Sequence, residues 1–290
     1  MKVQVLFVSH RIEFLKEFEK EALNYDVVVL EEPPNTKLFD YLNGRISKND
    51  YLESLETSFP KYTSYYLEVL RRLYVEGKKI LQIEPYLEKL GEIYELIEKG
   101  DVGGDEVVRL MERRVTKAWI EYQEAFLKRN FDGLVEKTIE FTKVDAERFK
   151  VRDKMRAEKI AESIPNADVL IEAGQIHVLL PILLKDKGLN VTEKSIPAEV
   201  AKRFGYKWML NPGSELTVKY ILGEKVDKSY ERIAAARALV YISMVSKEEI
   251  VPTADQSYPH LMDELNVVKF VNALDYDGCR KIFEKIWTNQ

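Results

Sequence analysis

The chain contains little of what several classes of protein require. Among its 290 residues are one cysteine, three histidines and ten prolines. The single cysteine, Cys279, excludes a disulfide framework and any cysteine-rich metal site. Acidic residues outnumber basic ones by 49 to 44, which leaves a net charge of −5. Because phosphate binding needs a basic face, this balance argues against nucleic acid as the main partner.

Long hydrophobic runs are also missing from the chain. The first residues, MKVQVLFVSH, form an apolar run too short for a signal peptide, and no small-residue cleavage site follows it. The longest later run, IAAARALVYISMV at 233–245, contains Arg237 and is shorter than a membrane span. The expectation is a cytoplasmic protein with no membrane span.

Short β-branched runs alternate with helical patterns along the rest of the chain. The expected strands are 2–9, 26–31, 79–83, 168–173 and 190–196. The first, second and fourth are nearly continuous in Val, Ile and Leu, which is typical of parallel strands covered on both faces. An amphipathic helix at 11–24 joins the first two strands as a βαβ unit. The predicted fold is therefore α/β, with a mostly parallel central sheet covered by helices.

The middle and the end of the chain are predicted to be helical. Residues 48–150 are charged and helix-periodic, and we interpret them as a large helical insertion, threaded by the strand at 79–83 over one edge of the sheet. Within it, the loop GDVGGDE (100–106) leads into a helix over about 104–129. Residues 213–290 are expected to form a C-terminal tail of three helices. The prediction is one α/β domain over 1–290 that carries this insertion and this tail.

Polar residues follow the predicted strands at the points where the strands end. They are His10, Glu31, Glu84, Glu172, Gly174, Gln175 and His177. The carboxyl ends of parallel strands meet at one edge of a sheet, where open α/β folds place their sites. Two imidazoles and a carboxylate at that edge could hold a divalent metal with an open position for water. They could equally supply a general base and acid, and each residue alone also fits an ordinary solvated strand end.

Two other polar residues are placed away from this edge. Glu32 follows Glu31 and should alternate to the opposite face of the sheet. His260 stands in QSYPHLMDEL after a proline, where a surface or helix-capping histidine is expected.

Among the residues at the sheet edge, Glu84 and Glu172 are secondary candidates for the site. Glu172 needs a partner such as Arg152 if it is buried.

The segments VRDKMRAEKIAESIPNADVLIEAGQIH (151–177) and DVVVLEE (26–32) together resemble one known superfamily. This is the TraB, Tiki, ChaN and erythromycin-esterase group, whose pattern has two G-x-x-H motifs that each end a strand. A glutamate closes the strand after the first motif, and an Arg-Asp pair opens the helix before the second. The resemblance covers about 1–35 and 150–185 well, the middle only as helices in the same place, and the last hundred residues hardly at all.

Residue by residue, the resemblance implies a set of site residues. Gly174, Gln175, Ile176 and His177 match the second G-x-x-H motif, Arg152 and Asp153 match the Arg-Asp pair, and Glu31 and His10 match the glutamate and the first histidine. The chain departs from the pattern at Phe7, where the first motif has glycine, and at Ile176, where the family often has a second one.

Physical chemistry gives several of these residues a reason. Gly174 at a strand end would permit a backbone turn and a close approach of a ligand. The fork of donors on Arg152 could hold Glu31 or a substrate carboxylate. Asp153, in the first turn of a predicted helix, fits helix capping as well as it fits catalysis.

The resemblance implies a hydrolase, peptidase- or esterase-like and assisted by a divalent metal. His10, Glu31 and His177 would bind the ion or orient a water molecule, and Arg152 would steady a carboxylate or an oxyanion. The substrate would be a small molecule or a peptide, and the insertion would wall the cleft.

Two alternatives stay open. A non-catalytic ligand- or haem-binding or regulatory protein of the same fold is implied by the ChaN-like and TraB-like branches, and the missing glycines favour it. The second alternative is a helical scaffold that self-associates through residues 104–149 and forms a homo-oligomer. Composition does not decide between a monomer and an oligomer.

Overall fold

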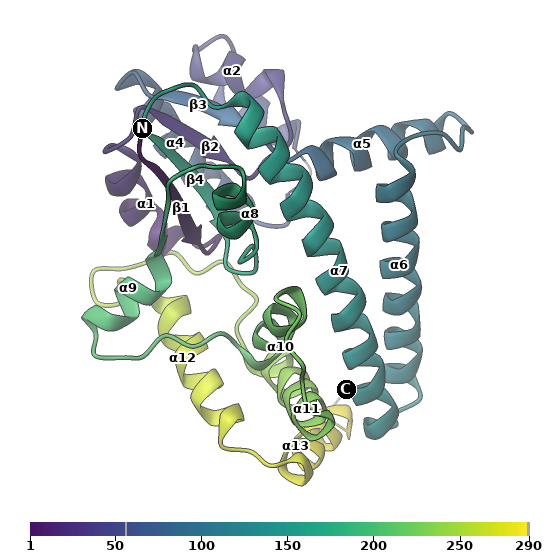
Figure 1. Ribbon diagram of the computed structural model, residues 1–290. Coiled ribbons are helices and arrows are strands. Elements are labelled where there is room, and N and C mark those ends of the chain that lie inside the picture. Colours follow the sequence, from purple (N-terminus) through teal and green to yellow (C-terminus); the bar gives the residue numbers. More distant parts are fainter. Residues whose placement is uncertain (56, 289–290) are drawn as a thin grey trace. The chain divides into compact units, whose positions relative to one another are not determined.

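The computed structural model in Figure 1 describes residues 1–55 and 57–288. Position 56, within the predicted insertion, and positions 289–290, at the end of the predicted tail, lie outside the described residues. The chain divides into two compact units. The first holds 1–88, 154–207 and 247–261, and the second holds 89–153, 208–246 and the residues from 262 onward.

The first unit contains a five-stranded sheet in which all strands are parallel. The strands are β1 (Val3–Val8), β2 (Val27–Leu30), β3 (Lys79–Gln82), β4 (Val169–Gly174) and β5 (Val191–Ser195). Each lies within one residue of its predicted bounds, so the α/β prediction with a parallel sheet is confirmed. The order across the sheet is β3-β2-β4-β1-β5, which inserts β4 between the first two strands. Val3 lies opposite Val169 on one side and Val191 on the other.

Both faces of the sheet are covered, as the apolar strands require. On one face Val5 and Ile171 pack into a cluster with Ile160 of α7 (Phe131–Ser163) and Leu184 of α8 (Leu180–Asp186). Glu172 points to the opposite face, because side chains alternate along a strand. The helix α4 (Pro60–Val75) lies over that second face and contacts Glu172 there through a tyrosine hydroxyl.

Local sequence signals explain where the helices of the first unit begin. They are η1 (Ile12–Phe14), α1 (Leu15–Ala22), α2 (Thr36–Leu42), α3 (Lys48–Glu53), α4, α8 and α9 (Ile196–Arg203). The predicted helix at 11–24 is η1 and α1. The side chain of Asn35 caps α2, and Ser47 and Asp50 form a reciprocal capping box at the start of α3. Proline occupies the first position of α4, where its missing N–H has no cost.

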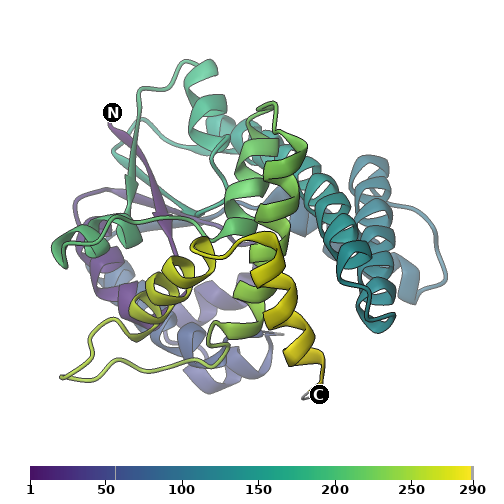
Figure 2. The ribbon, with the colours of Figure 1, turned by 90° about the horizontal axis from the view of Figure 1, so that it is seen from below.

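The second unit is helical. It contains α6 (Glu106–Leu127), α10 (Pro212–Ile221), α11 (Lys228–Met244) and α13 (Tyr276–Thr288), and the helices α5 (Pro85–Glu98), α7 and α12 (Pro259–Asn272) run through both units. In Figure 1, α6 and α7 run side by side in opposite directions, and Trp119 contacts Phe141 between them at a ring distance of 5.6 Å. In Figure 2, α11 lies beside α13, and Leu239 and Phe283 belong to one core cluster.

Two details of the helical prediction need correction or refinement. The described part of the tail has four helices, α10 to α13, instead of three, since Gly223 at φ 72° ends α10 and separates it from α11. The residues predicted as one insertion, 48–150, are divided between the units, with 48–88 in the first and 89–150 in the second. The strand within them, β3, pairs with β2 at the edge of the sheet.

The apolar run 233–245 lies in α11, where the guanidinium of Arg237 donates to the backbone carbonyl of Leu274 at 2.7 Å and 3.0 Å. Across the described residues, no helix has both the length and the apolar character that crossing a membrane would need.

The start of α12 is held by a buried carboxylate. Glu13, 5% exposed, accepts hydrogen bonds from the backbone N–H groups of His260 at 2.9 Å and Leu261 at 2.8 Å. His260 is itself buried, and its Nε2 accepts from the backbone N–H of Ile250 at 3.0 Å. The expectation of a surface histidine is therefore wrong, because this contact comes from a loop that no local sequence pattern reveals.

Replacing Glu13 with alanine is expected to lower the free energy of unfolding by about 2–3 kcal/mol, because two buried N–H donors lose their charged acceptor. Urea denaturation followed by circular dichroism measures this. Glu162→Ala, at an exposed position of α7, is the matched control and should change the value by less than about 0.5 kcal/mol. Equal effects of the two substitutions would contradict the assignment of Glu13 as a cap.

Candidate functional site

A cavity of about 160 Å³ opens at the carboxyl edge of the sheet in the first unit. Its lining includes the titratable side chains of His10, Glu31, Glu32, Tyr62, Tyr66 and Glu172. They come from the ends of β1 and β2, from β4 and from α4, which are far apart in the sequence. The structure thus brings His10, Glu31 and Glu172 to one cavity at this edge of the sheet.

Glu31 joins this cavity to the end of β4. Its Oε2 accepts a hydrogen bond from the backbone N–H of Gly174 at 2.7 Å, and its Oε1 lies 2.8 Å from His177 Nε2. The backbone N–H of His177 in turn donates to the carbonyl of Gly174 at 3.1 Å. One carboxylate thus holds both the turn after β4 and the imidazole that follows it.

His177 lies behind Glu31 and not in the cavity wall. It is 2% exposed, and the lining of the cavity does not include it. The expectation that His177 faces an open cleft is thus wrong, because the turn closes over the imidazole and leaves Glu31 between it and the cavity. His177 can orient Glu31, and its contact with any substrate would pass through that carboxylate.

Gly174 is not needed for a strained turn. Among the described residues, Gly174 is not one of the glycines with a positive φ. A Cβ at this position would lie 3.6 Å from Glu31 Oε2 and 3.6 Å from His177 Cδ2, which are ordinary van der Waals distances. The predicted conformational reason for this glycine is therefore wrong. The N–H of Gly174, which any residue except proline would have, makes the contact that matters.

A fully buried arginine links the ends of three strands. Arg156 donates to the carbonyl of Ile83 at 3.0 Å and to the carbonyl of Glu172 at 2.6 Å. Its guanidinium also lies 3.6 Å from Glu31 and 3.9 Å from Glu84. This guanidinium is 0% exposed, so its charge is met by these two carboxylates and by carbonyl oxygens.

Arg156 takes the place that the sequence suggests for Arg152. The guanidinium of Arg152 lies over the ring of Phe149, 5.4 Å from its centre, one helical turn earlier on α7. Asp153 is buried deep inside α7, which begins at Phe131, so the expectation of a residue in the first turn of a helix is wrong. The prediction put a helix start near residue 150, whereas the helix that begins at Phe131 continues through this position without a break.

Glu172 is the most enclosed carboxyl group of the cavity. It is 2% exposed, and its Oε2 accepts a hydrogen bond from the hydroxyl of Tyr66 at 2.6 Å. Burial raises the pKa of Glu172 to about 7, the charge of Glu31 adds to this, and Tyr66 and Arg156 oppose it. Burial likewise raises the pKa values of Tyr62 and Tyr66 well above 10, so both hydroxyls keep their protons at neutral pH.

Glu32 lies in the same cavity, which the sequence did not predict. β2 ends at Leu30, so the alternation of strand side chains no longer separates Glu32 from Glu31. Burial raises the pKa of Glu32 to about 7, and the charges of Glu172 and Glu31 act in the same direction. The side chain of Gln82 donates to Glu32 at 3.1 Å and opposes the shift, as does His10. Two carboxyl groups in one cavity thus change protonation near neutral pH.

The remaining predicted residues lie around this arrangement. His10 is exposed at the end of β1, and its ring lies 5.5 Å from that of Tyr62. Gln175 donates to the carbonyl of Val8 at 3.4 Å and ties the turn to β1. Glu84 is 0% exposed beside Arg156 and does not line the cavity.

The predicted metal ligands do not converge as a set. Among residues 1–55 and 57–288, no group of three or more His, Cys, Asp and Glu side chains is arranged to hold a metal ion. Of the three proposed ligands, His177 Nε2 is occupied by Glu31 and His10 stands at the outer side of the cavity. The chemistry on hand in this cavity is that of carboxyl, hydroxyl and imidazole groups.

A second cavity adjoins the first and shares Glu32, Thr57 and Thr63 with it. Its volume is about 360 Å³, and Pro33, Pro34, Tyr51 and Leu55 contribute to its wall. The apolar parts of that wall suit the non-reacting part of a ligand.

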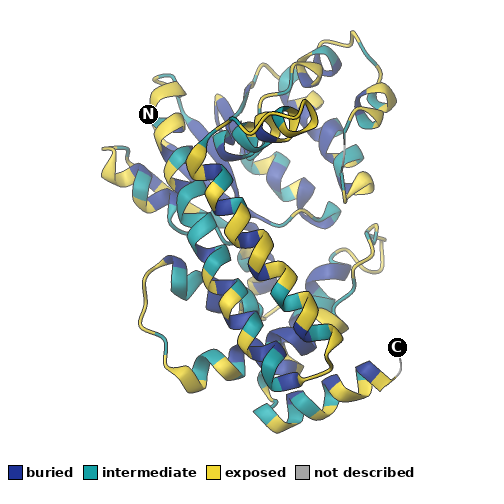
Figure 3. Ribbon diagram, turned by 90° about the vertical axis from the view of Figure 1, so that its right-hand side faces the viewer, coloured by how far each residue is buried: buried dark blue, intermediate teal, exposed yellow. Residues whose placement is uncertain are grey.

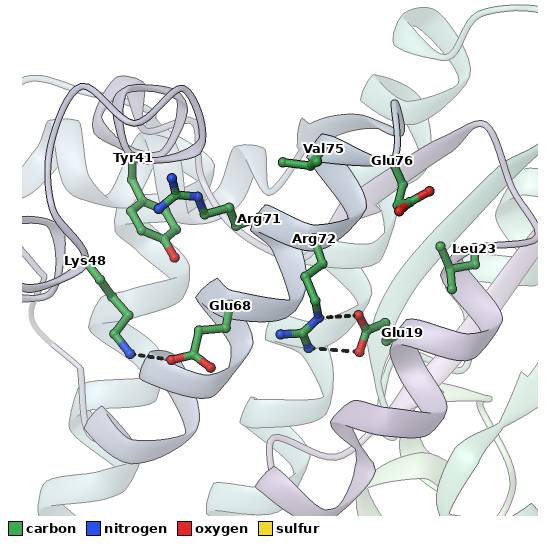
Figure 4. A pocket seen from close by; sticks show the side chains of 9 residues that line it. All are labelled: Glu19, Leu23, Tyr41, Lys48, Glu68, Arg71, Arg72, Val75 and Glu76. Atoms are coloured by element: carbon green, nitrogen blue, oxygen red, sulfur yellow. Dashed lines mark hydrogen bonds and ion pairs between the residues drawn. The ribbon is translucent and has the colours of Figure 1, made fainter.

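Another cavity of the first unit, of about 760 Å³, is lined mainly by charged side chains (Figure 4). There Arg72 donates to both oxygens of Glu19, at 2.5 Å and 2.9 Å, and Lys48 donates to Glu68 at 2.5 Å. The hydrogen bond to Glu19 raises the pKa of Arg72. The charges of Arg72 and Lys48 are thus met by carboxylates of the same cavity, whereas the smaller cavity holds two carboxyl groups whose pKa values are raised to about 7, so the smaller cavity is the candidate active site.

A protein of Archaeoglobus fulgidus is 39% identical to the chain over 286 residues, which are 99% of each of the two sequences. The chain belongs to the family of this archaeal protein. The relative carries the description "Uncharacterized protein", so it adds no activity to the argument. No family model matches the chain. No solved structure matches it either.

Four residues of the candidate site were not predicted from the sequence. They are Glu32, Tyr62, Tyr66 and Arg156. The spacing of Tyr62 and Tyr66 on α4 places them on one helix face, where the rings stack at 5.4 Å, and such spacing is equally typical of ordinary helix packing. Arg156 stands four residues after Arg152, which is one turn of the same helix, and a correct helix start would have given both arginines equal weight.

Proposed function

We propose that the protein is a hydrolase, peptidase- or esterase-like, which uses the carboxyl groups of Glu32 and Glu172 for proton transfer. The resemblance to the TraB, Tiki, ChaN and erythromycin-esterase group supports the same class. One observation carries the proposal: two carboxyl groups with pKa values raised to about 7 share a cavity at the carboxyl edge of a parallel sheet. General acid and base groups work best when their pKa lies near the working pH.

The environment of each carboxyl group suggests its role. Tyr66 and Arg156 both favour the ionised form of Glu172, so Glu172 is the group that loses its proton first and serves as the base. Once it is ionised, its charge favours the protonated form of Glu32, which serves as the acid. This division of roles follows the rule that neighbouring carboxyl groups are driven apart in pKa.

The proposed reaction is the addition of water to an ester or amide carbonyl. Glu172 takes a proton from a water molecule as its oxygen bonds to the carbonyl carbon. The hydroxyl of Tyr62, in the cavity wall, is placed to donate to the oxyanion. Glu32 then gives its proton to the leaving oxygen or nitrogen as that bond breaks, and the products are a carboxylic acid and an alcohol or amine.

The volumes of the two adjoining cavities fit the proposed reaction. Ligand cavities commonly measure about 300–1,000 Å³, so the inner cavity of about 160 Å³ has room for a water molecule and a reacting group alone. The adjoining cavity of about 360 Å³ would take the rest of a small molecule or a peptide end. Haem, the ligand implied by the ChaN-like branch, finds no support in an inner cavity of this volume.

The test is a panel of chromogenic esters and peptides assayed from pH 5 to pH 9 with wild type and Glu32→Gln. The expected result is a bell-shaped rate profile with its maximum near pH 7, and a kcat/KM at least about 100-fold lower in the variant. Glu53→Gln, at an exposed position of α3, is the matched control and should match wild type. A Glu32→Gln rate equal to that of wild type would contradict the proposal.

The metal-assisted form of the proposal has its own readout. Metal content is measured in wild type and in His10→Ala, both purified without chelators. A bound divalent ion that is lost in His10→Ala would support a metal at the outer side of the cavity. Equal metal content in the two proteins would remove His10 from any such site.

A further inference from the structure

The start of α4 is capped by a residue from a distant part of the chain. Glu249 accepts a hydrogen bond from the backbone N–H of Lys61 at 3.0 Å through Oε2, and from that of Tyr62 at 2.7 Å through Oε1. Nζ of Lys61 also donates to the backbone carbonyl of Glu249 at 3.3 Å. All three residues belong to the first unit, although 187 positions separate Tyr62 from Glu249. The cap of this helix therefore comes from the segment between α11 and α12.

This contact takes the place of a cap that the local sequence does not supply. Phe59, the residue before α4, makes no side-chain hydrogen bond to the helix, and Pro60 has no N–H. The first four N–H groups of a helix have no partner within it, and a polar side chain at the N-cap usually accepts from the second or third. These are the two N–H groups that Glu249 binds, and its negative charge suits the positive end of the helix dipole.

The helix α6 shows the usual, local arrangement. In Figure 3, where α6 faces the viewer, much of the helix has the colour of exposed residues, and its cap is the residue just before it, Asp105. The side chain of Asp105 accepts from the N–H groups of Val107 at 3.0 Å and Val108 at 3.1 Å. A local cap thus suffices for α6, whereas the cap of α4 ties the helix to a second segment of the chain.

The start of α4 forms a wall of the candidate active site. Four of its side chains line the inner cavity, those of Phe59, Tyr62, Thr63 and Tyr66. Tyr66 is held there through its hydroxyl, which donates to Glu172. Tyr62, one turn earlier, is held at its backbone by Glu249, and its ring stacks on that of Tyr66. The position of the Tyr62 side chain in this wall therefore depends on the first turn of the helix.

The capping segment is itself anchored by a buried histidine. The backbone N–H of Ile250, next to Glu249, donates to Nε2 of His260 at 3.0 Å. His260 is 6% exposed, and its own backbone N–H donates to Glu13 at 2.9 Å. The start of α12 thus holds the segment that caps α4.

We propose that Glu249 is a positioning residue of the hydrolase, which holds the first turn of α4 so that the hydroxyl of Tyr62 meets the oxyanion. This inference rests on the proposed function, because the oxyanion forms only if water adds to a carbonyl in the cavity. Without the cap the first turn frays, since its N–H groups turn to water. Glu32 and Glu172 follow or belong to strands and stay in place. Tyr62 alone is displaced, and a displacement of about 1 Å can cost about 100-fold in rate.

A double-mutant cycle on kcat tests the proposal with the ester and peptide panel. Glu249→Ala is expected to lower kcat at least about tenfold, and Tyr62→Phe about 100-fold because it removes the oxyanion donor. In the Tyr62→Phe background, Glu249→Ala should lower kcat less than about twofold, since the group that it positions is gone. Glu249→Gln keeps one acceptor and should lie between wild type and Glu249→Ala. Glu248→Ala, at the exposed neighbouring position, is the matched control and should match wild type.

A second readout does not need activity. In protein labelled with carbon-13 tyrosine, the ring signal of Tyr62 is assigned through Tyr62→Phe. Glu249→Ala is expected to shift this signal, and Glu248→Ala to leave it unchanged. Circular dichroism confirms that each variant is folded, and Glu249→Gln replaces Glu249→Ala in both experiments if the latter does not fold.

Two results would overturn the proposal. One is an unchanged Tyr62 signal in the Glu249 variant, and the other is an equal loss of kcat with and without the Tyr62 hydroxyl. An inactive wild type would instead overturn the proposed function, and the Tyr62 signal would still decide whether Glu249 places this side chain.

Discussion

Arg156→Met is expected to lower the free energy of unfolding by about 3–5 kcal/mol, because it leaves buried carboxylates without their counter-charge. The guanidinium lies 3.6 Å from Glu31 and 3.9 Å from Glu84, and both carboxylates are at most 9% exposed. Two backbone carbonyls, those of Ile83 and Glu172, would lose their donors as well. Methionine retains much of the side-chain volume, so the change isolates charge and hydrogen bonding from packing.

The control for this substitution stands one turn away on the same helix. Arg152→Met removes an arginine that lies over an aromatic ring, and it should cost less than about 1.5 kcal/mol. In the double variant Arg156→Met/Glu84→Gln, the loss should be smaller than in Arg156→Met alone, since one buried charge has gone too. Urea denaturation curves for the four proteins provide the comparison. Equal losses in Arg152→Met and Arg156→Met would show that Arg156 does not link the strand ends.

Glu172→Gln is expected to lower hydrolytic activity and to raise stability at alkaline pH. Glutamine can still accept the hydrogen bond of Tyr66, but it cannot take a proton from water, so kcat/KM should fall by about 1,000-fold. A carboxyl group that burial makes costly to ionise works against folding once it is charged. Its neutral replacement therefore stabilises the protein where the carboxyl group would be ionised.

The pH window of this effect follows from the direction of the shift. The pKa of Glu172 is raised from 4.5 in an unfolded chain to about 7 in the folded protein. The folded state holds the proton more tightly, so the stability from this group is fully present below pH 4.5 and is lost as pH rises through 7. Relative to wild type, Glu172→Gln should gain on the order of 3 kcal/mol at pH 8.5, and this gain should vanish near pH 4.

Thermal and urea unfolding at the two pH values measure this stability difference. Glu53→Gln, in the exposed part of α3, serves again as the control and should show no such pH dependence. A structural carboxylate would give the opposite sign, with Glu172→Gln less stable than wild type at pH 8.5. That result would remove Glu172 from the list of groups that change protonation near neutrality.

The sheet could be predicted from the sequence because its signals are local. Continuous runs such as VVVL in β2 and VLIEAG in β4 identify buried parallel strands without reference to the rest of the fold. The strand ends then place His10, Glu31 and Glu172 at one edge, and the structure brings them to one cavity. Because the strands are parallel, residues that follow different strands in the sequence become neighbours at one edge of the sheet.

The contacts that depend on helix phase and tertiary packing could not be predicted in this way. Which arginine of α7 faces the strand ends depends on the helix beginning at Phe131, and one turn separates Arg152 from Arg156. Whether His177 faces the cavity depends on a turn that Glu31 closes from another strand. Burial of His260 depends on a loop contact with Ile250. In each case the deciding contact or helix start lies outside the local sequence pattern.

The central claim is that the cavity keeps carboxyl groups able to exchange protons near neutral pH. Its most direct test is a pH titration of the side-chain carboxyl carbons by NMR, with carbon-13-labelled glutamate and with Glu32→Gln and Glu172→Gln to assign the signals. Two glutamates, Glu32 and Glu172, should titrate near pH 7. Titration of every glutamate below about pH 5 would contradict the account.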